Sequence, residues 1–189
     1  MRRTHTYEAL PTGLALQVAD LEARAWPGAC AGHDPALAPR AMVLVDEAGA
    51  VSASLALLYK EIPLAGRTYR AAGLSGVVTL PELRGRGLGA RLVAAARAEL
   101  AADPAVDLAL FSCDRELAPF YEAAGFEILP GTVLLGGTPA EPLATDEPGF
   151  DKAVLAAFFL HDEGRTDEVR AAFTGVRVPL YPGLIDRLW

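Results

Sequence analysis

Three glycines, Gly85, Gly87 and Gly89, alternate with larger residues in the segment from Arg84 to Ala90. Because glycine has no Cβ atom, the backbone N–H groups beside it are left uncovered. An alanine- and leucine-rich helical pattern follows directly, so these amides would lie at the positive end of a helix dipole. Free amides at a helix N-terminus bind anions, and the segment therefore predicts a site for a phosphate or diphosphate group.

Charge and one rival motif bear on this anion site. The side chains of Arg84, Arg86 and Arg91 would add positive charge suited to phosphate oxygens. The same letters also fit the dinucleotide fingerprint G-x-G-x-x-G/A, which needs a strand leading directly into the glycines and further strand–helix repeats. Here residues 81–84 intervene and too little chain follows. A glycine-rich turn that binds nothing stays open as the plain alternative.

The segments on either side must position these glycines. Residues 68–80 are apolar and rich in β-branched side chains and predict a long strand. Residues 88–100 predict a helix with one apolar face. After it, the continuous apolar run 106–113 suits a buried central strand, and residues 115–124 predict a short helix that Gly125 closes.

The remaining patterns alternate helices and strands along the chain. They predict a first strand at 4–10, a helix of about a dozen residues ending near Trp26, a loop at 28–39, a hairpin with strands at 41–46 and 51–60, a strand at 126–135, a surface loop at 136–149, the last central strand at 153–160, a helix at 162–173 and a small strand at 176–180. The length of 189 residues predicts one domain.

Composition limits the classes of function. Hydrophobic residues make up 52% of the chain and charged residues 22%, as in globular proteins, and no apolar run approaches the length of about 20 residues that a membrane helix needs. Cys30 and Cys113 are too few and too far apart for a disulfide framework or a zinc site, so we expect a reducing cytoplasm. The net charge of −7 argues against a nucleic-acid partner and is compatible with a cationic acceptor.

Two motifs resemble those of the GNAT acyl-CoA-dependent N-acetyltransferases. Arg84-x-x-Gly87-x-Gly89 matches the family's diphosphate loop, R/Q-x-x-G-x-G/A. The segment 111–129 resembles the family's second signature, a strand end and a short helix with the pattern F-Y-x-x-x-G-F, here starting at Phe120. The resemblance implies an α/β fold with a mixed, mostly antiparallel sheet of about six or seven strands flanked by helices. It also implies a single acetyltransferase domain over residues 1–189 that uses acetyl-CoA.

The resemblance also implies roles for individual residues. The diphosphate-binding residues would be Arg84, Gly85, Arg86, Gly87, Leu88, Gly89 and Ala90. The backbone of Val77, Val78 and Thr79 would pair with the pantetheine arm, and a main-chain N–H of that strand would polarise the thioester carbonyl. Tyr121 would be the general acid, because a phenol with a pKa of about 10 can protonate a thiolate. Packing of Tyr121 on the core is the alternative.

The two ends of the chain resemble aminoglycoside 2′-N-acetyltransferases. The resemblance rests on the loop Gly32-His33-Asp34 and on the terminal residues Asp186-Arg187-Leu188-Trp189. It implies that Asp34, Asp186 and Trp189 bind the substrate, since carboxylates bind ammonium groups, and that the activity confers antibiotic resistance. At position 75, where those enzymes carry a glutamate, this chain has a serine.

The sequence therefore predicts a cytoplasmic acetyl-CoA:amine N-acetyltransferase whose leading acceptor is an aminoglycoside or a related amino sugar. A peptide or protein N-terminus and a small polyamine are alternative acceptors, and a sensor that binds acyl-CoA without turnover is an alternative of another class. Glu82 and the pair His33–Asp34 are candidates for the general base, and neither is singled out. We expect a small-molecule amine as partner, no nucleic acid, membrane or metal, and leave a homodimer open.

Overall fold

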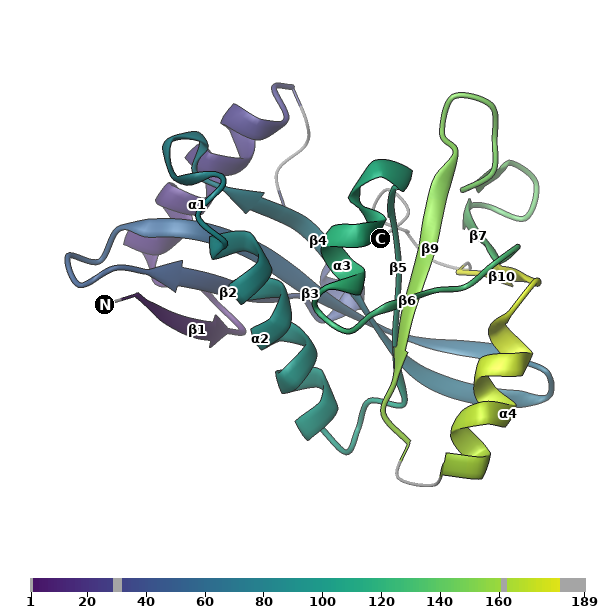
Figure 1. The fold of residues 1–189 in the computed structure, drawn as a ribbon. Coiled ribbons are helices and arrows are strands. Elements are labelled where there is room, and N and C mark those ends of the chain that lie inside the picture. Colours follow the sequence, from purple (N-terminus) through teal and green to yellow (C-terminus); the bar gives the residue numbers. More distant parts are fainter. Residues whose placement is uncertain (1, 29–31, 161–162, 181–189) are drawn as a thin grey trace.

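The computed structural model of the chain describes residues 2–28, 32–160 and 163–180 (Figure 1). Its main sheet has seven strands in the order β1-β2-β3-β4-β5-β9-β6. Their bounds are β1 Arg3–Tyr7, β2 Arg40–Val45, β3 Val51–Leu64, β4 Arg67–Thr79, β5 Leu108–Asp114, β9 Lys152–Phe158 and β6 Glu127–Ile128. Every neighbouring pair is antiparallel except β4 and β5. The predicted mixed, mostly antiparallel sheet is confirmed.

Two helices cover opposite faces of the strands β2 to β4. They are α1, Thr12–Ala25, and α2, Leu88–Ala102. On β2, Val43 belongs to the apolar cluster that contains Leu21 of α1. Its neighbours Met42 and Leu44 belong to the cluster that contains Leu92 of α2. Because successive side chains of a strand point to opposite faces, the sheet separates the two helices.

The parallel strands β4 and β5 pair only at their first residues. Ala71 pairs with Leu108 and Ala72 with Ala109, and beyond these pairs the two strands diverge (Figure 1). From Gly73 onwards β4 is therefore paired with β3 on one side only, within the described residues. The backbone groups on its other side are free to pair with an added ligand.

A bulge interrupts β4 in the same stretch. Ser54 of β3 pairs with Val78, whereas Ala56 pairs with Ser75, so β4 has one residue more than β3 between these pairs. Gly76 lies in this interval with a φ of +59°. An extra residue bends a strand and turns its backbone groups away from the regular ladder, and a positive φ favours glycine there.

The elements after β4 also follow the predictions. A 3₁₀ turn, η2 Pro81–Leu83, leads through the glycines into α2. Behind β5 come a second 3₁₀ turn, η3 Arg115–Leu117, and the short helix α3 Ala118–Glu122. Gly125 follows α3 with a φ of +90°. The predicted loop at 28–39 contains a further turn, η1 Pro35–Leu37, among its described residues.

Two predictions for the second half of the chain are wrong. The strand expected at 126–135 is divided, because residues 130–131 form a turn in which Gly131 has a φ of +72°. Its first part is β6 in the main sheet, and its second part is β7, Val133–Gly137, in a second sheet. The loop expected at 136–149 contains a strand of that second sheet, β8 Pro142–Ala144.

The second sheet has three strands in the order β10-β7-β8. The helix α4, Glu163–Phe173, leads into β10, Arg177–Pro179, which pairs in parallel with β7. The side chain of Phe173 is fully buried and lies edge-to-face with Tyr69 of β4, at 5.1 Å between ring centroids. This contact packs the end of α4, just before β10, on the main sheet. None of the described helices has the length and apolar character to span a membrane.

Candidate functional site

The glycine loop leaves its backbone uncovered, as expected from its residue types. Gly85 and Gly87 both have a φ of +74°, and Gly87 is the N-cap of α2 without any side-chain cap. A Cβ atom at either position would meet no other atom within 4 Å. The two glycines are therefore needed for the backbone conformation and border open space, not packed protein.

The first amides of α2 have no acceptor in the described part of the chain. The N–H of Arg91 donates to the carbonyl of Gly87 at 3.0 Å, which closes the first helical turn. The N–H groups of Leu88, Gly89 and Ala90 have no acceptor among the described residues. Three free donors at the positive end of a helix dipole form a site for an anion.

The arginines near the loop differ in their contacts. Arg86 is exposed and has no hydrogen bond or ion pair to the described residues. Arg84 is also exposed and makes a long bond of 3.4 Å from Nε to the carbonyl of Thr79. Arg91 instead donates to the carbonyl of Arg2 at 2.6 Å. Arg84 and Arg86 are thus available to an anion at the loop, whereas Arg91 holds the segment before β1.

The third glycine has a different role from the first two. A Cβ atom at Gly89 would lie 3.1 Å from Oγ1 of Thr79 and 3.5 Å from Cζ of Phe120. The first contact would require Oγ1 of Thr79 to move by a few tenths of an ångström, whereas the second is an ordinary van der Waals distance. Glycine therefore lets α2 lie close to β4 and α3 without displacing either. Gly89 thereby brings together the glycine loop, the end of β4 and the Phe120–Tyr121 pair.

The three β4 residues expected to face the cofactor lie where that strand has lost its β5 partner. Val78 is buried with the α1 cluster, and Val77 packs against the core on the other face. Thr79 is half-buried and pairs with Ala53 of β3. Their backbone groups lie between the bulge at Gly76 and the glycine loop.

Tyr121 lies in an aromatic cluster on α3. The residue is 7% exposed, and its ring lies edge-to-face with those of Phe111 and Phe120, each at 5.0 Å between centroids. Burial raises the pKa of the Tyr121 phenol well above its ordinary value, and the charge of Asp114 adds to the effect. The expected pKa of about 10 is therefore corrected upwards, because burial disfavours the phenolate. The hydroxyl remains protonated and can serve as a hydrogen-bond donor.

The end of β5 contains a hydrogen-bonded thiol and an ion-paired carboxylate. Burial first, and the charge of Asp114 second, raise the pKa of the Cys113 thiol to about 11. Its Sγ donates to the carbonyl of Asp114 at 3.2 Å. The Asp114 carboxylate forms an ion pair with Lys152 at 2.5 Å. Cys113 is thus a thiol near neutral pH, and neither residue is set up as a nucleophile or a free base.

The acidic residues weighed from the sequence have other partners or lie elsewhere. Glu82 is exposed and paired with Arg24 at 2.5 Å, and the hydrogen bond to its own backbone N–H and the Arg24 guanidinium lower its pKa. Asp34 caps the turn η1, accepting the N–H of Ala36 at 2.8 Å. Asp186 and Trp189 lie outside the described residues.

One carboxylate at the site was missed from the sequence. Glu22 of α1 is half-buried, and its Oε1 approaches the bulge so that a Cβ atom at Gly76 would lie 3.7 Å from it. The available signal was its place in the helix. Glu22 is four residues after the buried Val18 and directly follows the buried Leu21, so it borders the apolar face of α1.

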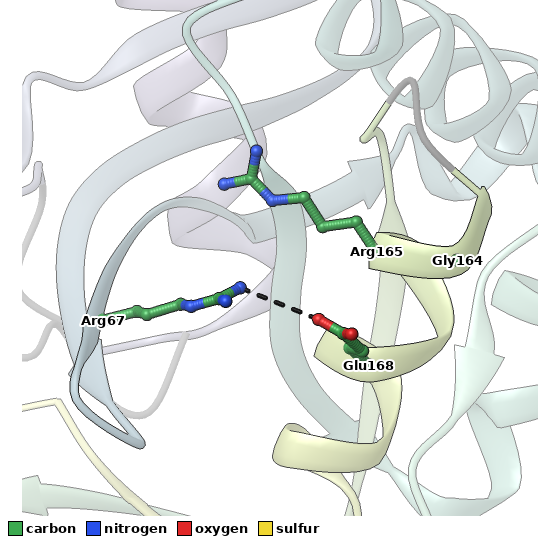
Figure 2. Close-up of a pocket in the computed structure, with 4 residues that line it drawn as sticks. All are labelled: Arg67, Gly164, Arg165 and Glu168. Carbon is green, nitrogen blue, oxygen red and sulfur yellow. Dashed lines mark ion pairs between the residues drawn. The ribbon is translucent and has the colours of Figure 1, made fainter.

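A polar depression lies far from the glycine loop. It has a volume of about 490 Å³ and is lined by Arg67, Gly164, Arg165 and Glu168 (Figure 2). Nη1 of Arg67 and Oε2 of Glu168 are 3.9 Å apart. Arg67 begins β4, whereas the glycine loop follows the end of that strand at Thr79. The depression is therefore formed by the β3–β4 turn and α4, and it is not part of the site around the loop.

Residues 15–129 match the family model described as acetyltransferase (GNAT) domain. This range includes most of α1, the glycine loop and the helix with Tyr121, but not the second sheet. No curated protein matches the chain by sequence.

Solved structures share the fold at low sequence identity. Escherichia coli ElaA is 14% identical, with a TM-score of 0.56, over 82% of this chain and 99% of its own. Glucosamine-6-phosphate N-acetyltransferase from Arabidopsis thaliana is 15% identical, with a TM-score of 0.52, over 66% of this chain and 90% of its own. A conserved protein of unknown function from Enterococcus faecalis is 18% identical, with a TM-score of 0.56; 70% of this chain matches 33% of that one.

Proposed function

The chain belongs to the GNAT acetyltransferase family, and from this membership we propose that it transfers the acetyl group of acetyl-CoA to a primary amine. One observation carries the proposal. The amides of residues 88–90 have no acceptor in the described part of the chain and open onto the uncovered glycines Gly85 and Gly87. Such a group of donors fits the diphosphate of coenzyme A.

The residues of the loop fit that diphosphate by charge as well as by shape. The backbone from Gly85 to Ala90 would donate to the phosphate oxygens, and the exposed guanidinium groups of Arg84 and Arg86 would neutralise them. A side chain at Gly85 or Gly87 would fill the space that the phosphates need.

The pantetheine arm and the thioester of the cofactor would lie along the edge of β4 that has no β5 partner. Acetyl-CoA supplies the acetyl group as an activated thioester. Residues Val77, Val78 and Thr79 would pair through their backbone with the amide groups of the pantetheine arm, as an added strand pairs with a sheet edge. The bulge at Gly76 would aim a backbone N–H at the carbonyl oxygen, where negative charge develops during transfer.

Tyr121 is the proposed hydrogen-bond and proton donor to the departing sulfur. Its raised pKa keeps the hydroxyl protonated, so it can donate a hydrogen bond to the departing thiolate. The same shift makes the phenol a weaker acid, so its proton would pass to sulfur only as negative charge develops there. The neighbouring Phe120 lies against α2 at Gly89. This links the two sequence motifs within one site.

For the acceptor, we propose a cationic amine, with an aminoglycoside or related amino sugar as the first candidate. The net charge of −7 favours the approach of a polycation. Asp34 has one carboxylate oxygen that caps η1 and a second oxygen that would bind an ammonium group. Asp186 and Trp189 are proposed from the sequence resemblance alone.

A thiol-release assay tests the proposal. Acetyl-CoA would be offered with kanamycin, spermidine, glucosamine 6-phosphate and a short peptide with a free N-terminus, and binding of acetyl-CoA would be measured in parallel by calorimetry. We expect binding together with amine-dependent release of coenzyme A. Binding without turnover on any amine would favour a sensor. Absence of binding, or binding of NAD in its place, would overturn the proposal.

A further inference from the structure

The carboxylate of Glu22 lies on the face of the sheet opposite the glycine loop helix. Glu22 is on α1, in the turn that ends where the N–H of Trp26 donates to the Glu22 carbonyl at 2.8 Å. Its Oε1 would be 3.7 Å from a Cβ atom at Gly76. The side chain therefore reaches the bulge of β4, in the stretch where that strand has no β5 partner.

The position of Glu22 is fixed by contacts on both sides of it. Val18 and Leu21 are buried in the same apolar cluster as Val78 of β4. Arg24 forms an ion pair at 2.5 Å with Glu82, which lies in the turn η2 before the glycine loop. The C-terminal half of α1 is thus attached to β4 and to the connector, and the backbone of Glu22 is held beside the bulge.

Two other carboxylates near this stretch form their ion pairs away from the bulge. The strand β4 contains no acidic residue. Asp114, at the end of β5, is paired with Lys152, and Glu82 is paired with Arg24. Of the acidic side chains discussed for the site, Glu22 is the one whose oxygen approaches the bulge.

We infer that Glu22 binds the ammonium group of the acceptor and accepts its proton, so that the neutral amine attacks from the α1 face. The inference rests on the proposed acetyl transfer. A thioester laid along the edge of β4 presents two faces, and a cofactor anchored at the start of α2 approaches from the α2 side. The α1 face is left for the amine, and there Glu22 provides a negative charge beside the proposed position of the carbonyl.

The proton and electron balance of the step is complete. The acceptor R–NH₃⁺ gives one proton to the Glu22 carboxylate, and the freed lone pair forms the new C–N bond. The C–S bond breaks with its electron pair left on sulfur, which takes a proton from Tyr121. The nitrogen loses a second proton, which returns to Tyr121 through water. The products are the amide, coenzyme A as a thiol, and one proton that Glu22 releases to solvent.

The test replaces Glu22 with its neutral isostere. For the Glu22→Gln variant we expect kcat/KM for the best amine of the panel to fall by about 100-fold at neutral pH, the lower range for loss of a general base. The affinity for acetyl-CoA should stay unchanged. Asp20→Asn, which removes an exposed carboxylate from the same helix, is the matched control and should keep full activity. Circular dichroism and melting temperature would establish that both variants fold.

A pH series separates a proton acceptor from a structural residue. The ratio of kcat/KM between the wild-type protein and Glu22→Gln should shrink as pH rises towards the pKa of the acceptor amine, because a neutral amine needs no base. Arg24, Glu82, Arg84 and Tyr121 are present in both proteins, so the ratio reports the change at residue 22. Glu22→Asp should retain part of the activity. A ratio that is constant with pH, or a Glu22→Gln variant as active as Asp20→Asn, would overturn the inference alone. A wild-type protein inactive on every amine would overturn the proposed function with it.

Discussion

The glycine loop and the region of the second sheet differ in whether their polar groups are hydrogen-bonded within the chain. At the start of α2, the N–H groups of residues 88–90 have no acceptor in the described part of the chain, and the space beside Gly87 is open. Where the chain enters the second sheet, the buried Thr132 hydroxyl donates to the carbonyl of Phe173 at 2.7 Å and accepts the N–H of Gly175 at 3.0 Å. Paired buried groups add to stability, whereas donors left open at a helix N-terminus can bind a ligand. Changes in the loop should therefore affect binding, and changes in the second sheet should affect folding.

The largest effect is expected from Gly87→Val. A side chain there would fill the space for the diphosphate and would disfavour a φ of +74°, so we expect affinity for acetyl-CoA to fall by more than about 100-fold, or roughly 2.7 kcal/mol. Calorimetry would measure the affinity. Gly66→Val is the matched control, because Gly66 has a φ of +75° and open space around it but lies in the β3–β4 turn. Equal affinities in the two variants would contradict the assignment of the loop.

Thr132→Val should produce the converse result. The substitution keeps the shape of the side chain but leaves the Phe173 carbonyl and the Gly175 N–H without their partner, which should cost about 2 kcal/mol of unfolding free energy. Urea denaturation would measure the loss, with the exposed Thr68→Val as control. Acetyl-CoA affinity of the folded variant should be unchanged. A loss of affinity without a loss of stability would break the distinction between the two regions.

The same contrast explains what could be predicted from the sequence. The glycine loop, α2 and the helix with Tyr121 depend on neighbours along the chain, so residue types and spacing were sufficient. The second sheet depends on pairing between Val133 and Arg177, which are distant in sequence and leave no periodic signal. The turn at residues 130–131 divides an apolar run that otherwise looks like one strand. Glu22 was missed for the same reason, since only the folded chain brings it to Gly76.

Tyr121→Phe tests a residue that is buried like the second sheet and yet belongs to the site. The variant keeps the aromatic packing against Phe111, so stability should hardly change. We expect kcat to fall by about tenfold, roughly 1.4 kcal/mol, from loss of a hydrogen bond to the thiolate. Because the pKa of Tyr121 is raised, wild-type kcat should not decline through ionisation of this phenol near pH 10. Tyr69→Phe, at a buried tyrosine near Phe173, is the control. Equal turnover in Tyr121→Phe and the wild-type protein would remove the acid role.

Ser54→Ala gives the smallest effect and the strictest test. Ser54 is 1% exposed and pairs with Val78 beside the bulge, and its hydroxyl has no hydrogen-bond partner in the described part of the chain. A buried hydroxyl without a partner costs free energy, so its removal should leave stability unchanged or raise it by up to about 1 kcal/mol. Thr132, also a buried hydroxyl, is predicted to do the opposite because it is paired. Urea denaturation of both variants under the same conditions would compare them directly. A loss of more than about 1 kcal/mol in Ser54→Ala would mean that this hydroxyl is hydrogen-bonded after all, for instance to a bound water. The polar groups beside the bulge would then be paired like those of Thr132.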